Sequence, residues 1–187
     1  MKTKKYLAME EFIPVSERIS LTAFRRTDKE NLLLYMNDPV LYHNTLRVPN
    51  PYTEKDADAW LAKTEQDEVD FGTTVNWSIR DREAGLIGSI GSFVKNGFEG
   101  HSDEIGYWLG APFRGKGIMT EVVRAFVGYL LESRPPLVRV EAWTLPANEA
   151  SGKVLEKAGF QREGYCRKMF VKNGEYRDAI LYARLRE

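Results

Sequence analysis

The stretch from residue 104 to residue 144 combines a strand, a helix and a second strand, and this order constrains the fold more than any other feature. Residues 104–109 (EIGYWL) alternate as a strand does, and Val138 to Thr144 is rich in β-branched and aromatic side chains. Between them, apolar residues recur on one broad helical face: Ile118, Met119, Val122, Val123, Phe126, Val127 and Leu130. Because a helical crossover joins parallel strands, we expect a parallel pair with the helix packed on the sheet.

The remainder of the chain supplies the other elements of one mixed α/β domain. Further strand patterns cover Arg18–Arg26, Thr73–Arg80, Leu86–Val94 and two tail segments around an Asn173-Gly174 turn. Further helical patterns cover Asp28–Met36, Thr53–Glu65 and Asn148–Ala158, and His43–Tyr52 is expected to be a loop. We therefore expect a single domain over residues 1–187, with a mostly antiparallel sheet of about seven strands and about four helices.

Charge and composition exclude several classes of partner. The chain has 27 Lys and Arg against 27 Asp and Glu, so nothing favours a nucleic acid or an anionic membrane overall. The single cysteine, Cys166, and the two histidines have no zinc-binding spacing, so we expect no metal. The first residues, MKTKKYLAMEE, are followed by no long apolar stretch, which predicts a cytoplasmic protein.

The segment Arg114, Gly115, Lys116, Gly117 lies between a strand and the start of a helix, which predicts an anion site. Amides in the first turn of a helix lack partners within the helix and favour a phosphate. Two nucleotide chemistries fit this position. GAPFRGKG matches the phosphate-loop pattern GxxxxGK[ST] except at Gly117, where the hydroxyl that binds magnesium is missing, so an NTPase ranks second.

The alternative is the pyrophosphate-binding pattern R-x-x-G-x-[G/A]. These residues fit it from Arg114, except that Met119 stands where Gly or Ala is usual. With GYWLGAPFRGKGIMTE, NEASGKVLEKAGF and NGEYRDAILYARL, the second half of the chain resembles the GNAT N-acetyltransferase superfamily. It is most similar to the branch that acetylates ribosomal-protein N-termini. The resemblance implies that acetyl-CoA lies between the fourth and fifth strands, which splay apart. The residues it implies for the cofactor are Trp108, Leu109, Arg114, Gly115, Lys116, Gly117, Ile118, Met119, Thr120 and Asn148.

Acetyl transfer to an amine requires a base and a proton for the leaving thiolate. Glu104 shares a strand face with Gly106, whose missing side chain leaves space for an amine beside the carboxylate, although an ion-paired surface glutamate fits the pattern equally. Many superfamily members have a tyrosine acid seven residues after the asparagine, but this position is Leu155. By resemblance we expect Ser151 to hydrogen-bond the departing sulfur instead. Ser151 also fits an ordinary helix-start serine, and Asn148 an N-cap.

The acceptor is expected to be an amine. Deprotonating an α-amine at pH 7 costs about 1 kcal/mol, against about 4.6 kcal/mol for lysine, so a site with one carboxylate favours an α-amine. The resemblance points to a protein or peptide N-terminus or a small-molecule amine as the acceptor. A non-catalytic module that senses acyl-CoA or binds a peptide stays open as an alternative, and so does a homodimer.

Overall fold

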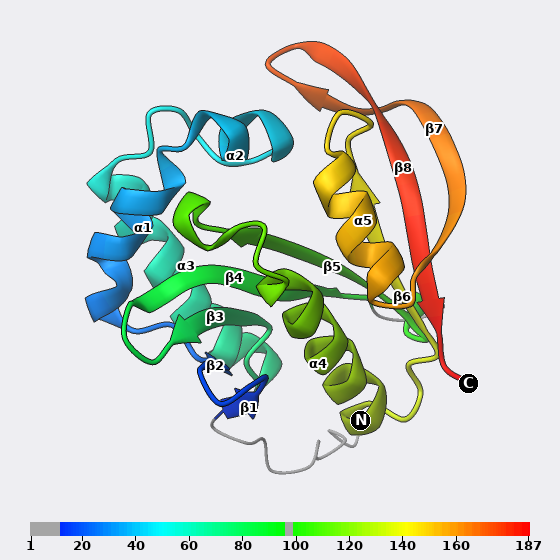
Figure 1. Ribbon diagram of the computed structural model, residues 1–187, viewed down its shortest axis with the longest axis horizontal. Helices are drawn as coiled ribbons and strands as arrows, with labels where there is room; N and C mark the ends of the chain where they lie inside the picture. The colour runs from blue at the N-terminus through cyan, green and yellow to red at the C-terminus, as the bar shows by residue number, and fades with distance from the viewer. Residues whose placement is uncertain (1–11, 96–98) are drawn as a thin grey trace.

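A mixed sheet organises the protein, which is described by a computed structural model over residues 12–95 and 99–187 (Figure 1). Within these residues the strands are β1 (Phe12–Pro14), β2 (Ile19–Thr22), β3 (Asn76–Asp81), β4 (Gly85–Val94), β5 (Ser102–Leu109), β6 (Arg139–Thr144), β7 (Gln161–Lys172) and β8 (Glu175–Leu185). The α-helices are α1 (Lys29–Met36), α2 (Pro39–Asn44), α3 (Glu54–Phe71), α4 (Ile118–Ser133) and α5 (Glu149–Lys157). The strand order is β1-β2-β3-β4-β5-β6-β8-β7, and only β5 and β6 are parallel neighbours in it.

The two faces of the sheet are covered by different helices. On one face, the broad apolar side of α4 packs with α5 against the sheet and buries Val122, Val123, Phe126 and Val127 completely. On the other face, α1 and α3 pack together over Leu86 of β4. Strand alternation assigns neighbouring residues to opposite faces, and Ile87, next to Leu86, lies in the α4 cluster.

The structure confirms the mixed α/β class, the mostly antiparallel sheet and the parallel pair around α4. The described residues hold eight strands and five α-helices, against about seven and about four expected. The additional strand, β1, has three residues, and the additional helix, α2, has six, so neither is long enough to display a period. His43 lies in α2 and not in a loop as predicted.

Helix α3 extends to Phe71, six residues beyond its predicted end at Glu65. Its start is as predicted, because the Thr53 amide donates to the Asp56 carboxylate at 2.8 Å in a capping box. The extension is mostly polar, so an apolar period cannot reveal it. Pairs one turn apart support it instead: Lys63 with Asp67 at 2.5 Å and Gln66 with Asp70 at 2.8 Å.

The described ranges contain no helix that combines the length and the apolar character needed to cross a lipid bilayer. The expectation based on the first residues, MKTKKYLAMEE, concerns positions 1–11, which lie outside the described residues. The single domain over residues 1–187 stays a prediction of the sequence.

Candidate active site

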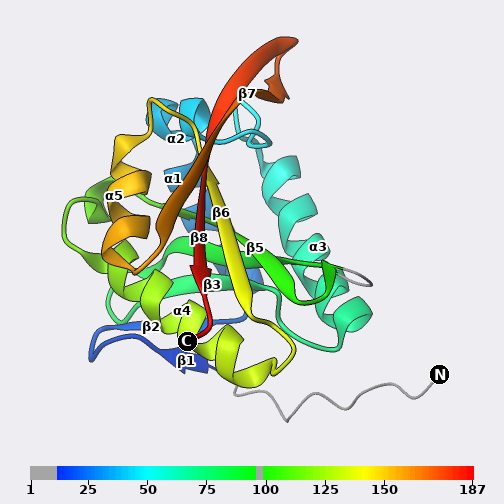
Figure 2. The ribbon, with the colours of Figure 1, turned by 90° about the vertical axis from the view of Figure 1, so that its right-hand side faces the viewer.

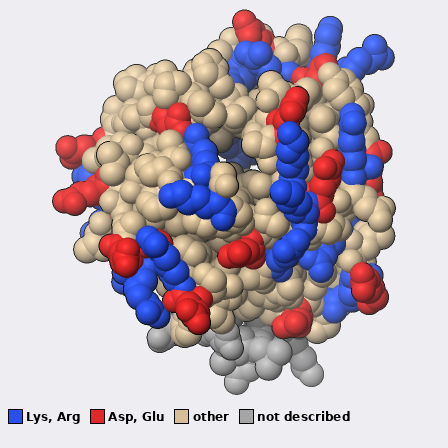
Figure 3. Space-filling view, viewed as in Figure 1, with Lys and Arg blue, Asp and Glu red and all other residues tan. Residues whose placement is uncertain are grey.

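The opening between β5 and β6 defines the candidate site. The two strands pair only where Ser102–Glu104 faces Arg139–Glu141. Beyond these residues β5 pairs with β4 and β6 with β8, so the two parallel strands separate as expected. A pocket of about 510 Å³ lies at the separation, within the size range of small-molecule sites. Figure 3 shows it as a hollow between α2 and α5, on a face where charges of both signs are mixed.

The start of α4 provides a row of unpaired backbone amides. Gly115 and Gly117 have φ values of +74° and +81°, which suit glycine, and Gly117 is the N-cap of the helix. Among the described residues, the amides of 115–119 have no hydrogen-bond acceptor, whereas the Thr120 amide donates to the Gly117 carbonyl at 3.0 Å. The Met119 side chain is buried in the core, so it does not cover these amides. The loop can therefore bind an anion through its main chain.

The two basic side chains of this loop have different surroundings. Arg114 Nε donates to the Leu109 carbonyl at 2.8 Å, and its Nη2 lies 2.6 Å from Asp38 Oδ2. Asp38 is also the N-cap of α2, where its Oδ1 accepts from the Val40 amide at 2.8 Å. The Arg114 guanidinium thus joins the loop to β5 and α2, while Lys116 is exposed and lies 5.9 Å from the Phe113 ring centroid.

Glu104 lines the pocket together with Gly106 and Trp108, and the intervening Ile105 and Tyr107 line it as well. A Cβ on Gly106 would lie 3.4 Å from Phe93 Cε2, so the missing side chain leaves space beside the carboxylate. Burial raises the pKa of the Glu104 carboxyl above its ordinary value, and the nearby Lys95 ammonium opposes this rise. A half-buried carboxylate with a raised pKa is suited to accept a proton.

Asn148 and Ser151 meet at the start of α5 on another wall of the same pocket. Asn148 is the N-cap, and its Oδ1 accepts from the Ser151 amide at 3.3 Å. Leu155, one turn further along the helix, is fully buried in the core. The structure thus brings Glu104, Trp108, Asn148 and Ser151 together as lining residues of one pocket.

Tyr107 is a pocket residue that sequence reasoning missed. Its hydroxyl oxygen lies 2.8 Å from Ser151 Oγ and 3.3 Å from the Ser151 carbonyl oxygen, so its one proton can be directed to either atom. Burial raises the pKa of the Tyr107 phenol well above its ordinary value. Alternation along β5 assigns Tyr107 to the face opposite Glu104. Its position in the strand therefore indicates only a residue that packs in the core. Its role depends on α5, which returns to β5 44 positions later in the sequence.

Several aromatic side chains line the pocket. Trp60, Phe93, Trp143 and Phe170 line it, and the Trp143 and Phe170 rings meet edge to face with centroids 5.8 Å apart. Arg47, from the segment after α2, places its Cζ 5.6 Å from the Phe93 ring centroid. This wall can bury an apolar acceptor body and presents one cation.

Lys172, at the end of β7, connects the β7-β8 hairpin to α2. Figure 2 shows the hairpin extending past the sheet beside α2. The Lys172 ammonium donates to the carbonyls of Tyr42 and Thr45, the latter at 2.6 Å, and lies 3.8 Å from the Tyr42 ring centroid. Asn173 adds a bond from its side-chain amide to the Tyr42 hydroxyl at 2.8 Å. Because Thr45 and Phe170 both line the pocket, these contacts connect two segments of its lining.

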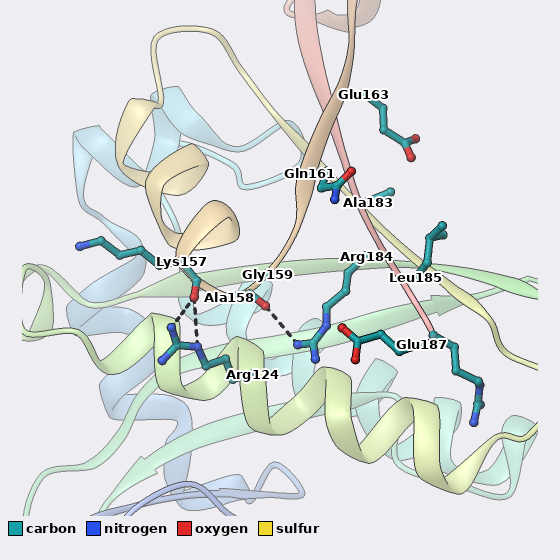
Figure 4. Close-up of a pocket in the computed structure, with 11 residues that line it drawn as sticks. Arg124, Lys157, Ala158, Gly159, Gln161, Glu163, Ala183, Arg184, Leu185 and Glu187 are labelled. Atoms are coloured by element: carbon teal, nitrogen blue, oxygen red, sulfur yellow. Dashed lines mark hydrogen bonds between the residues drawn. The ribbon is translucent and has the colours of Figure 1, made fainter.

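A second pocket of about 490 Å³ lies between α4, the end of α5 and the end of β8 (Figure 4). Two of its arginines bind carbonyls at the end of α5, as Figure 4 shows: Arg124 donates to the Lys157 carbonyl, and Arg184 to the Ala158 carbonyl at 3.1 Å. Basic side chains at a helix C-terminus stabilise the helix. We therefore interpret this pocket as structural. In the described part of the chain, no group of three or more His, Cys, Asp and Glu side chains is arranged for a metal ion.

Comparison with known proteins connects this geometry to a family. Residues 18–161 match the family model described as "Acetyltransferase (GNAT) domain". The "Probable N-acetyltransferase YjcK" of Bacillus subtilis is 49% identical over 74 residues, covering 40% of this chain and 40% of that protein. The "[Ribosomal protein uS5]-alanine N-acetyltransferase" of Escherichia coli is 31% identical over 97 residues, covering 52% and 48%. The chain thus spans about half or less of the length of these relatives in the alignments.

Solved structures extend the likeness over nearly the whole chain. A GNAT-family acetyltransferase from Bacillus anthracis superposes with a TM-score of 0.79 at 27% identity, covering 93% of this chain and 98% of that one. The microcin C7 self-immunity acetyltransferase MccE, in complex with acetyl-CoA and AMP, gives a TM-score of 0.82 at 22% identity, covering 95% and 98%. The second likeness shows the fold alone.

Proposed function

Because this chain belongs to the acetyltransferase (GNAT) family, we propose that it transfers an acetyl group from acetyl-CoA to a primary amine. The acceptor is a protein or peptide N-terminal α-amine or a small-molecule amine. One observation carries the proposal: the unpaired amides of residues 115–119 lie at the start of α4, where the loop follows directly from β5 and its open splay. A helix start with free amides binds a diphosphate, and the splay provides the place for the rest of the molecule.

The residues present fit acetyl-CoA as a co-substrate. Amides from Gly115 to Met119 would bind the diphosphate, and the exposed Lys116 would add charge there. The β5 backbone at Trp108 and Leu109 and the side chain of Asn148 would hold the pantetheine arm. Arg114 supports this arrangement indirectly, because its hydrogen bond to the Leu109 carbonyl and its ion pair with Asp38 hold the loop against β5 and α2.

Glu104 is the proposed base. Direct attack in a ternary complex requires a neutral amine, and the raised pKa of Glu104 brings the carboxyl closer to the pKa of an α-amine. Glu104 belongs to β5 and Ser151 to α5, on different sides of the opening. Glu104 would therefore act on the amine nitrogen that attacks the acetyl carbon, and Ser151 on the sulfur that leaves it. The amine proton leaves towards Glu104, while the thiolate receives a hydrogen bond from Ser151.

Measurements of CoA binding and of turnover test this function. Calorimetry should detect CoA binding without magnesium, and free thiol should appear when acetyl-CoA is mixed with a panel of peptides and small amines. Glu104→Gln should lower kcat while CoA still binds. Attack by a neutral amine gives the kcat/KM profile an acid limb at the pKa of the acceptor amine. Glu104 should add a second ionisation above the ordinary glutamate pKa of 4.5, because burial raises the pKa of Glu104, and Glu104→Gln should remove this ionisation.

The alternatives give different results in the same experiments. A phosphate-loop NTPase would bind magnesium-ATP and ignore CoA. A non-catalytic acyl-CoA sensor or peptide-binding module would bind CoA, release no thiol with any amine, and be unaffected by Glu104→Gln. Absence of CoA binding by the folded protein would refute the proposed function. Cytoplasmic location and a homodimer stay predictions of the sequence.

A further inference from the structure

Two hydroxyl groups from distant parts of the chain meet inside the candidate pocket. Tyr107 Oη of β5 and Ser151 Oγ of α5 are 2.8 Å apart, and both residues line the pocket. The Ser151 backbone is held by the Asn148 cap, so the serine side chain starts from a fixed position. Neither hydroxyl has a charged partner among the described residues.

The proton positions of this pair have two arrangements. In the first, Ser151 donates to Tyr107 Oη, and the tyrosine proton is directed to the Ser151 carbonyl at 3.3 Å. In the second, Tyr107 donates to Ser151 Oγ, and the serine proton needs another acceptor. Among the described residues, the Ser151 hydroxyl has no bond other than the one to Tyr107. In the second arrangement its proton is therefore available to a ligand atom in the pocket.

We propose that Tyr107 is a positioning residue, which donates to Ser151 Oγ and thereby directs the Ser151 proton to the sulfur of the leaving thiolate. This inference rests on the proposed function. A hydroxyl that accepts one hydrogen bond becomes a stronger donor for the next, and a fixed rotor removes the unproductive orientations. Tyr107 thus adds a residue of β5 to a role that the family resemblance implied for Ser151 alone.

The chemistry balances without a net proton change on either hydroxyl. The amine nitrogen forms a bond to the acetyl carbon, the carbon–sulfur bond breaks, and its electron pair stays on sulfur. The amine loses one proton to Glu104 and solvent, and one proton from solvent completes the thiol. Tyr107 and Ser151 keep their own protons and stabilise the charge on sulfur.

Two other features support the assignment. Leu155, one turn beyond Ser151, is fully buried and has no proton to donate, so that position supplies no competing group. The buried Tyr107 phenol has a raised pKa and stays protonated, which keeps it a donor throughout the reaction. On this wall of the pocket, the described hydroxyl groups that contact each other are therefore those of Tyr107 and Ser151.

The experiment compares Tyr107→Phe, Ser151→Ala and the double variant with Tyr165→Phe. Tyr165 is the matched control, because its hydroxyl donates to Asp178 at 2.6 Å on the exposed hairpin, away from the pocket lining. The first readout is the pKa of the thiol of bound CoA, which is measured from the ultraviolet absorbance of the thiolate. It requires no acceptor. The second is kcat and KM with the amine that the thiol-release panel identifies.

We expect Ser151→Ala to raise the pKa of the bound thiol by about one unit and Tyr107→Phe to raise it by about half a unit. Tyr107→Phe should lower kcat about three- to tenfold with unchanged KM for acetyl-CoA. Without the tyrosine hydroxyl, the Ser151 hydroxyl rotates freely and is a weaker donor, and each effect lowers kcat by a small factor. The double variant should resemble Ser151→Ala, because Tyr107 acts through the serine.

An unchanged thiol pKa in both single variants, with CoA still bound, would overturn the inference and leave the proposed function intact. Additive losses in the double variant would also overturn it, since they would mean that Tyr107 acts independently. If Tyr107→Phe did not fold, Ser151→Ala would decide alone: an unchanged bound-thiol pKa would refute the serine donor on which the role of Tyr107 depends. Loss of CoA binding by the wild type would be a failure of the proposed function itself.

Discussion

The glycine that begins α4 permits a quantitative test, because the same helix contains a second glycine as a control. Gly117 has a φ of +81°, while Gly128 lies inside α4. A Cβ added at either position would meet no atom within 4 Å. Replacement by alanine therefore isolates the effect of backbone conformation from that of steric contact.

The two substitutions should change stability in opposite directions. At Gly117 the left-handed conformation costs an alanine about 1 to 2 kcal/mol, partly offset by the lower entropy of the unfolded chain, which leaves a loss of about 1 kcal/mol. At Gly128 an alanine should stabilise the helix interior by about 0.5 to 1 kcal/mol. The variants should thus differ by about 2 kcal/mol, or roughly 4 to 8 °C in Tm for a chain of this size.

Urea unfolding measures these differences, and calorimetry with CoA measures the consequence for binding. Gly117→Ala should weaken CoA about tenfold or more, because relaxing φ turns the amides of the first turn away from the diphosphate and loses a charge-assisted bond. Gly128→Ala should bind CoA as the wild type does. A stability change of the same sign in both variants, or full CoA affinity in Gly117→Ala, would refute this explanation of the loop.

Three further predictions concern the supporting structure. The Arg18 hydrogen bond to buried Asp81 lowers the pKa of that carboxyl from 3.8 to about 2, so the stability it contributes is present above about pH 4 and is lost as the pH falls towards 2. Asp81→Asn should lower the free energy of unfolding by about 1 to 2 kcal/mol at pH 7. Urea unfolding at a series of pH values should then show a smaller loss of stability between pH 4 and pH 2 in this variant. Leu155→Ala should lower the free energy of unfolding by about 2 to 5 kcal/mol, since the side chain is fully buried. Lys172→Met should release the hairpin from the Tyr42 carbonyl and raise KM for the acceptor, with unchanged CoA affinity by calorimetry.

Each of these predictions has an outcome that contradicts it. An equally steep loss of stability between pH 4 and pH 2 in Asp81→Asn would assign the acid sensitivity to other groups. A stability cost below about 1 kcal/mol for Leu155→Ala would show that the core around α5 collapses into the space. Weaker CoA binding in Lys172→Met would mean that the hairpin supports the cofactor side of the pocket and not the acceptor side.

The periodic part of the fold and the position of the free main-chain amides at the start of α4 were predictable from the sequence. The wide apolar face of α4 is a local pattern, so the helix, the strands on either side and their parallel pairing follow from residue spacing alone. The loop glycines and the face of Glu104 follow from the same short-range rules. The short elements β1 and α2 were missed, because three and six residues are too few to display a period.

The chemistry of a wall of the pocket depended on contacts between distant segments. Tyr107 occupies a strand position whose period indicates only packing, and it contacts Ser151 because α5 returns against β5. Arg114 matches an anion-binding pattern, yet its guanidinium binds Asp38 at the start of α2. Spacing along the chain determined which backbone groups are free at α4. Tertiary structure decided which side chains share the pocket, because hydrogen bonds between distant residues form only after the sheet and helices have packed.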